Sequence, residues 1–140
     1  MLSRVREAER PTALLDTSAV IDLPILLSQG KLPGKLAICS VTLAELAAGP
    51  AATADPLERA RRQDRLQRVE ATFEPIPFGI SAARAYGQVY AAARARDGHS
   101  RRRPADLLIA AIAAAEGMLL ITRNPDDFVG LEDIVPVLGL

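Results

Sequence analysis

The sequence is poor in the residues on which several common kinds of protein chemistry depend. It contains one cysteine, Cys39, and one histidine, His99, so an intrachain disulfide and a zinc site built from clustered cysteines and histidines are both excluded. We expect Cys39 to lie in the core, because its segment is apolar, and His99 to be exposed in a polar loop. The longest apolar run, residues 107–115, is too short for a membrane span of about 20 residues. A soluble, cytoplasmic protein is therefore expected.

Lysine is scarce as well, with only Lys31 and Lys35 among 17 basic residues, and 17 acidic residues bring the net charge to zero. This balance neither indicates nor excludes a nucleic-acid partner. Hydrophobic residues make up 49% of the 140 and charged residues 24%, which is typical of a globular domain. We expect residues 1–12 to form a polar N-terminal leader and residues 13–140 to form a single domain.

Short apolar segments alternate with helical patterns along the chain. Strands are expected at 12–15, 36–39, 118–121 and 134–138. Helices are expected at 19–27 with an interruption near Pro24, and at 41–48, 55–73, 80–93 and 105–116. Such alternation predicts a three-layer α/β/α domain with a mainly parallel central sheet.

Acidic side chains come after predicted strands or at the start of predicted helices. Asp16 closes the first strand, and we expect Glu45 and Asp106 in the first turns of their helices. Asn124, Asp126 and Asp127 follow the third strand. In open α/β sheets ligands bind at the carboxyl ends of the strands, where these residues should meet.

Each of these acidic residues also has an ordinary structural explanation. Asp16 could cap a helix, Thr42 and Glu45 have the spacing of a capping box, and Asp106 could respond to the helix dipole. The Asn-Pro-Asp-Asp segment is also good turn chemistry. Asp106 is the exception, because it belongs to the most apolar helix, where a carboxylate needs a partner.

A cluster of carboxylates at one edge of the sheet would be self-repelling unless a cation lay between them. Oxygen ligands from Asp and Glu suit Mg²⁺ or Mn²⁺ and do not suit zinc. The pattern therefore favours a site for a hard divalent cation.

Four segments of the sequence resemble the PIN domain, and in particular the VapC-type toxins of bacterial toxin–antitoxin pairs. They are LLDTS at 14–18, VTLAEL at 41–46, PADLLIAA at 104–111 and ITRNPDDF at 121–128. They occur in the family's order and with its usual spacing, from about Ala13 to the C-terminus. The resemblance implies a Mg²⁺- or Mn²⁺-dependent endoribonuclease, a hydrolase that acts on RNA, is inhibited by a cognate antitoxin and forms a homodimer.

The resemblance also assigns roles to individual residues. It implies that Asp16, Glu45 and Asp106 bind the metal, with Asp127 or Asn124 as near-equal candidates for the fourth position and Asp126 below them. The hydroxyls of Thr17, Ser18 and Thr122 would orient these groups, unless they only cap helices. Apart from the resemblance, the charge run of Arg101, Arg102 and Arg103 is a candidate contact for RNA or the antitoxin, and a solvated loop is the alternative. Hydrolysis by a metal-activated water would leave 5′-phosphate and 3′-hydroxyl ends.

Two other functions are to be compared with the nuclease. A phosphatase of the haloacid-dehalogenase type needs Asp-x-Asp after the first strand, and Ser18 occupies the second position. The alternative from a different class is a catalytically inactive PIN-like interaction module. Asn124, at a position where many PIN domains have an aspartate, is the feature that favours it.

Overall fold

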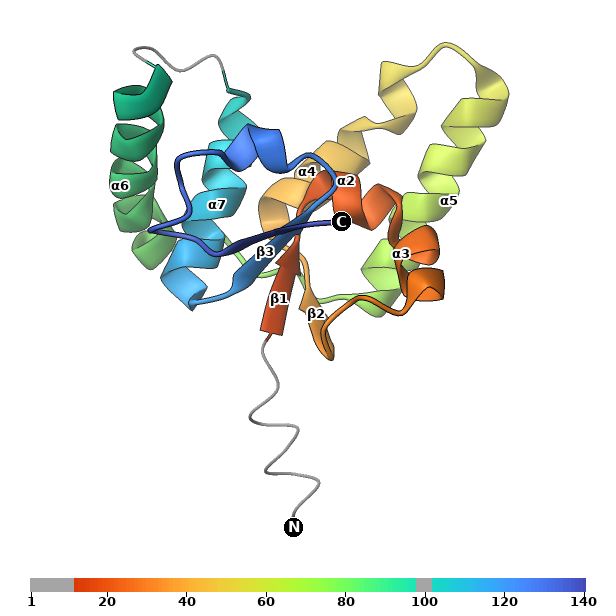
Figure 1. The fold of residues 1–140 in the computed structure, drawn as a ribbon. Helices are drawn as coiled ribbons and strands as arrows, with labels where there is room; N and C mark the ends of the chain where they lie inside the picture. The colour runs from red at the N-terminus through yellow and green to blue at the C-terminus, as the bar shows by residue number, and fades with distance from the viewer. Residues whose placement is uncertain (1–11, 98–101) are drawn as a thin grey trace.

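The computed structural model describes residues 12–97 and 102–140. Its strands are β1 (Thr12–Leu15), β2 (Lys35–Ala37), β3 (Leu119–Thr122) and β4 (Val137–Gly139). Its helices are α2 (Thr17–Ile21), α3 (Leu23–Gln29), α4 (Ser40–Ala48), α5 (Pro56–Thr72), α6 (Ile80–Asp97) and α7 (Pro104–Glu116). Two 3₁₀ turns, η1 (Pro50–Ala52) and η2 (Pro125–Phe128), complete the described part (Figure 1).

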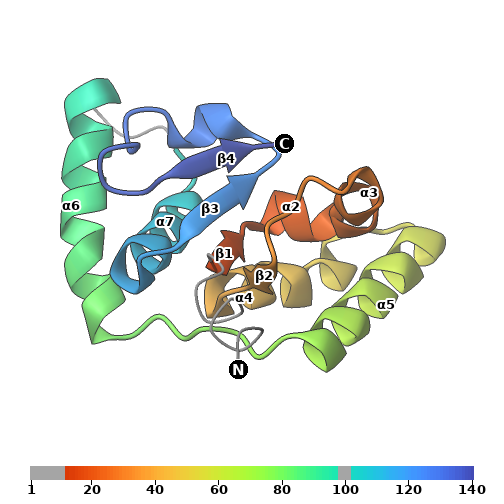
Figure 2. The same ribbon diagram turned by 60° about the horizontal axis from the view of Figure 1, so that its bottom comes forward.

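The four strands form one parallel sheet in the order β2-β1-β3-β4. Leu14 in β1 is paired with Ala37 of β2 on one side and Leu120 of β3 on the other. The first and third strands along the chain are therefore neighbours, and their carboxyl ends lie side by side (Figures 1 and 2). This places the segments after β1 and β3 at the same edge of the sheet.

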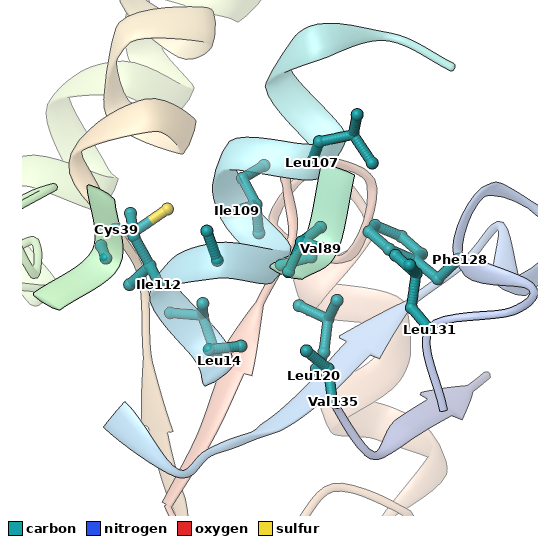
Figure 3. Close-up of a cluster of buried hydrophobic side chains, with 14 of the residues drawn as sticks. Leu14, Cys39, Val89, Leu107, Ile109, Ile112, Leu120, Phe128, Leu131 and Val135 are labelled. Atoms are coloured by element: carbon teal, nitrogen blue, oxygen red, sulfur yellow. The ribbon is translucent and has the colours of Figure 1, made fainter. Parts of the chain in front are cut away.

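Alternate residues of the central strands face opposite layers of helices. Leu14 and Leu120 are fully buried in the same cluster as α6 and α7, together with Phe128 and Val135 (Figure 3). Ala13, Leu15 and Ile121 point to the other side, where α2, α3 and α5 cover the sheet. The predicted three-layer α/β/α fold with a parallel sheet is confirmed.

Several expected boundaries were wrong. The interruption expected near Pro24 in the helix at 19–27 is present but lies at Asp22, where α2 and α3 meet, and Pro24 is in the first turn of α3. The strand expected at 36–39 ends at Ala37, and the one expected at 134–138 begins at Val137. Glu45 is not in the first turn of α4, because that helix begins at Ser40.

The predictions for Cys39, His99, the N-terminal leader and a membrane span have different outcomes. Cys39 is fully buried, and burial raises the pKa of its thiol, so its assignment to the core is confirmed. His99 and the expected leader at 1–12, apart from Thr12, lie outside the described residues. No described helix combines the length and the apolar character needed to cross a bilayer.

Candidate active site

Asp16 lies directly after β1 and is 3% exposed. Its backbone N–H donates to the Ile121 carbonyl of β3 (3.0 Å), which holds the two strand ends together. Its Oδ1 atom caps α2 by accepting from the N–H of Ala19 (2.9 Å), and it also accepts from the Ser18 hydroxyl (2.6 Å). The capping role weighed for Asp16 is thus present. Both bonds fall on Oδ1, which leaves Oδ2 available for another partner.

Hydroxyl groups join the segments that follow β1 and β3. The Ser18 oxygen accepts from the backbone N–H of Arg123 (3.0 Å) and lies 3.4 Å from the Thr122 hydroxyl. The Thr122 oxygen in turn accepts from the N–H of Asn124 (2.9 Å). Ser18 and Thr122 therefore fix the segment after β3, which carries Asn124, Asp126 and Asp127, relative to Asp16.

Glu45 approaches this edge from the second turn of α4. Its Oε1 accepts from the Thr17 hydroxyl (2.6 Å), and its Oε2 accepts from the Arg103 guanidinium. The capping-box explanation for Thr42 and Glu45 is wrong, because Cys39 is the N-cap and Thr42 is fully buried inside the helix.

Thr42 belongs to the site, which the sequence did not predict. Its oxygen accepts from Thr17 (3.3 Å) and from the Cys39 thiol (3.8 Å), so it links α4 to the start of α2. A hydroxyl between the apolar residues Val41 and Leu43 was the signal that could have revealed it.

Asp106 lies in the first turn of α7, as expected, and is 6% exposed. Across residues 12–97 and 102–140 its carboxylate has neither a hydrogen bond nor an ion pair. Its pKa is raised to about 6, chiefly by burial, with Arg103 opposing the rise and the nearby charges of Asp127, Asp16 and Glu45 adding to it. A buried anion without a partner is costly, so this carboxylate needs either a proton or a cation.

Asp127 fits the fourth cation-ligand position better than Asn124 or Asp126 does. Asp127 is half-buried in η2 and its charge acts on Asp106, whereas Asn124 and Asp126 are exposed. The Asn124 side chain forms no capping bond to η2. These observations support the choice of Asp127 among the candidates left open by the sequence.

The donor set fits a hard divalent cation, since Asp16, Glu45 and Asp127 all act electrostatically on Asp106, a buried carboxylate without a hydrogen bond or ion pair in the described structure. Within the described ranges, however, no three such side chains already stand around a common point. Glu45 is turned towards Arg103 instead. A cation at this place would compete with the Arg103 guanidinium for Glu45.

The arginines before α7 have different surroundings. Arg103 is 64% exposed and faces Glu45, at the open side of the acidic cluster. Arg102 is only 9% exposed and is bound to Asp97 and to two backbone carbonyls, so it is not free to bind RNA phosphates as expected. Arg101 lies outside the described residues.

A hollow of about 460 Å³ opens beside Glu45 between α2, α4 and α5. Thr17, Glu45 and Arg103 are among the residues that line it, together with Arg62 and Arg65 of α5. Glu58 neutralises Arg62, but Arg65 has no ion pair within the part of the chain that the structure describes. Arg62, Arg65 and Arg103 bring positive charge to a hollow that Glu45 also lines.

The family model described as "PIN domain" matches residues 13–132, and these include all four acidic segments. The chain belongs to the PIN-domain family. The family predicted from four short segments is therefore confirmed, and PIN-domain ribonucleases are generally dependent on divalent metal ions.

Individual PIN-domain proteins agree with this assignment. "Ribonuclease VapC5" of Mycobacterium tuberculosis (strain ATCC 25618 / H37Rv) is 36% identical over 128 residues, or 89% of this chain and 90% of that protein. The crystal structure of VapBC-5 from the same species, a member of the VapBC family of toxin–antitoxin systems, has a TM-score of 0.76, with 92% and 97% of the two chains covered at 36% identity. FitAcB from Neisseria gonorrhoeae has a TM-score of 0.71 with 91% and 96% covered, and at 24% identity it shares the fold.

Proposed function

We propose that this PIN domain is an endoribonuclease that requires Mg²⁺ or Mn²⁺ and acts as the toxin of a toxin–antitoxin pair. The observation that carries the proposal is the buried Asp106 carboxylate, which has no partner in the described structure and faces three further acids. An inactive interaction module would have no need to keep such a costly group. The similarity to a protein named as a ribonuclease supports the same conclusion.

Asp16, Glu45, Asp106 and Asp127 are the residues that would hold the cation. When bound, a divalent cation supplies a Lewis acid that offsets the charge developing on a phosphodiester and makes water a better nucleophile. Thr17 and Ser18 orient the Glu45 and Asp16 carboxylates through their hydroxyl groups. Hydrolysis of this type leaves 5′-phosphate and 3′-hydroxyl ends.

The RNA substrate would approach through the hollow beside Glu45. Arg65 and Arg103, which both line this hollow, would contact backbone phosphates. Asp126 and Asn124, which are exposed, have no direct part in this scheme.

An antitoxin protein is the partner of this chain in the same proposal. A second groove of about 320 Å³ between α2, α3 and α5 is lined by apolar side chains such as Leu23, Leu27 and Phe73, flanked by Arg65 and Arg68. An apolar groove with basic edges suits an amphipathic helix that carries acidic residues. A homodimer and a cytoplasmic location, where RNA and an antitoxin would be met, belong to the same proposal.

The proposal is tested with Asp16→Asn, which is expected to remove RNA cleavage and to weaken the stabilisation by Mn²⁺. Asparagine caps helices about as well as aspartate, so α2 should still form and the substitution should remove charge alone. Thermal melts with and without Mn²⁺, together with sequencing of the RNA ends, measure the two effects. A wild-type protein without any response to Mn²⁺ would favour the inactive module, and 2′,3′-cyclic phosphate ends would contradict hydrolysis by water.

Replacing Arg103 by glutamine is expected to strengthen Mn²⁺ binding and to weaken RNA binding. Because Arg103 now binds Glu45, its removal should tighten Mn²⁺ binding, by a factor of about 2 to 5 for an exposed ion pair. Because its guanidinium is also placed to contact phosphate, RNA binding should weaken and become less sensitive to salt. Titration with Mn²⁺ tests the first effect. RNA binding in Ca²⁺, measured at several salt concentrations, tests the second.

Arg61→Gln is the matched control for Arg103→Gln, because Arg61 is 65% exposed and pairs with Glu58 on α5, outside the hollow. Neither Mn²⁺ nor RNA binding should change in this variant. Equal changes in both variants would mean that total charge, and not the position of Arg103, is responsible.

A further inference from the structure

Arg102 is the most deeply buried of the described side chains that form ion pairs, although it lies in a run of three arginines. Its Nε donates to Asp97 at the end of α6 (2.9 Å). Its Nη1 donates to the backbone carbonyl of Asp127 (3.2 Å), and its Nη2 donates to that of Val129. One guanidinium therefore connects the end of α6 with both sides of Phe128, in the segment that carries the fourth acid.

This segment has little regular structure of its own to fix Asp127. It is the four-residue 3₁₀ turn η2, whose N-cap residue, Asn124, forms no side-chain capping bond. Phe128 is fixed in the core, and Gly130 follows with a positive φ of 90° as the chain turns away. On either side of Phe128, the carbonyls of residues 127 and 129 are oriented by Arg102.

We propose that Arg102 is a positioning residue for the cation site, which holds the Asp127 carboxylate towards Asp106 by fixing the backbone on which it is carried. The inference rests on the proposed function, since it takes Asp127 to be a cation ligand. Arg102 acts through geometry and not through its charge, because Asp97 pairs with that charge. A planar guanidinium can satisfy two carbonyls and a carboxylate at once, whereas a lysine ammonium lacks this fixed fork.

The test is a double-mutant cycle read out as Mn²⁺ affinity, measured by titration well below the melting temperature of every variant. Arg102→Gln is expected to weaken Mn²⁺ binding about tenfold, the lower end of the range for residues that orient metal ligands. In the Asp127→Asn background the same substitution should change affinity less than about twofold, because the ligand on which Arg102 acts is already gone. Arg102→Lys, which keeps the charge, should resemble Arg102→Gln and serves if glutamine prevents folding.

Phe128→Leu is the control for general loosening of the segment, since it removes packing in η2 and leaves the carbonyl bonds in place. It should lower the melting temperature with little change in Mn²⁺ affinity. The inference would be overturned if Arg102→Gln lost the same Mn²⁺ affinity in the wild-type and the Asp127→Asn backgrounds. It would also be overturned if Arg102→Gln lost no affinity although Asp127→Asn weakens Mn²⁺ binding. If Asp127→Asn leaves the affinity unchanged, the inference fails, but the proposed function stands as long as Asp16→Asn abolishes the response to metal.

Discussion

Replacing Asp106 by asparagine should stabilise the metal-free protein and at the same time abolish both RNA cleavage and the response to Mn²⁺. The carboxylate is 6% exposed and unpaired in the described structure, and burial raises its pKa to about 6 from an ordinary value of 3.8. A shift of this size corresponds to about 3 kcal/mol of unfavourable free energy for the ionised group near pH 8. A neutral amide avoids most of that cost, although it must still find hydrogen-bond partners.

We therefore expect Asp106→Asn to increase the free energy of unfolding in EDTA by about 1 to 3 kcal/mol at pH 8. For a chain of this size that is a rise in melting temperature of about 5 °C. Without the central ligand, cleavage should fall by about 10³-fold or more, because a bound cation contributes several kcal/mol to catalysis. Thermal melts in EDTA and in Mn²⁺, with a cleavage assay on the same samples, provide the measurements.

Asp64→Asn is the control, because it makes the same chemical change on an exposed residue of α5 that pairs with Arg68. It should alter neither the metal response nor the cleavage rate. If Asp106→Asn destabilised the metal-free protein instead, the Asp106 carboxylate would have to be a structural group with a partner, and the main support for the proposed function would be lost.

The stability of the metal-free protein should fall as the pH rises from about 4 to about 7. Since the pKa of Asp106 is higher in the folded state than in the unfolded state, the folded protein holds the extra proton between these two values. Raising the pH removes that proton and leaves a buried anion. The contribution of Asp106 is most favourable below its unfolded pKa of 3.8 and is lost as the pH passes about 6.

Melting temperatures in EDTA between pH 4.5 and pH 8 measure this effect, and the difference between wild type and Asp106→Asn isolates it from other titrating groups. The wild-type curve should fall below that of the variant above pH 6, and Mn²⁺ at pH 8 should restore the wild type only. Parallel curves for the two proteins across this range would show that Asp106 is ionised in the same way in the folded and unfolded chains.

The layers of the fold could be predicted because the pattern of apolar residues directly reflects burial. Leu14 and Leu120 pack on one side of the sheet while Ala13 and Ile121 pack on the other, as alternation requires. The position of Asp16 followed from the same pattern, because it comes immediately after the first apolar strand. Asp106 could be recognised as a candidate site residue because a carboxylate among apolar residues has no ordinary structural explanation.

The start of α4 could not be predicted from local sequence, and this led to the wrong turn for Glu45. Thr42 and Glu45 have the spacing of a capping box, but pairing with a distant segment fixes where the helix begins. The N–H of Ser40 donates to the carbonyl of Ile76 (2.8 Å), and the N–H of Ile76 donates to that of Ile38 (2.9 Å). Contacts over more than 30 residues thus overruled a local signal.

The different fates of Arg102 and Arg103 were also hidden from the sequence. The two residues are adjacent and identical, yet one is buried against backbone carbonyls 25 and 27 residues away and the other is exposed beside Glu45. Backbone carbonyls leave no trace in the sequence, so a charge pattern could not have separated a structural arginine from one that faces the site.

The pairing of β1 with β3 has a consequence for when activity can first arise. Asp16 and Asp127 are brought together only after a strand from the first part of the chain has accepted a partner from the last quarter. A partly synthesised chain, still short of its C-terminal segment, has the first acids but no complete site. Nuclease activity should thus appear only once the segment around residue 127 has been made, and truncation before that residue should yield an inactive product.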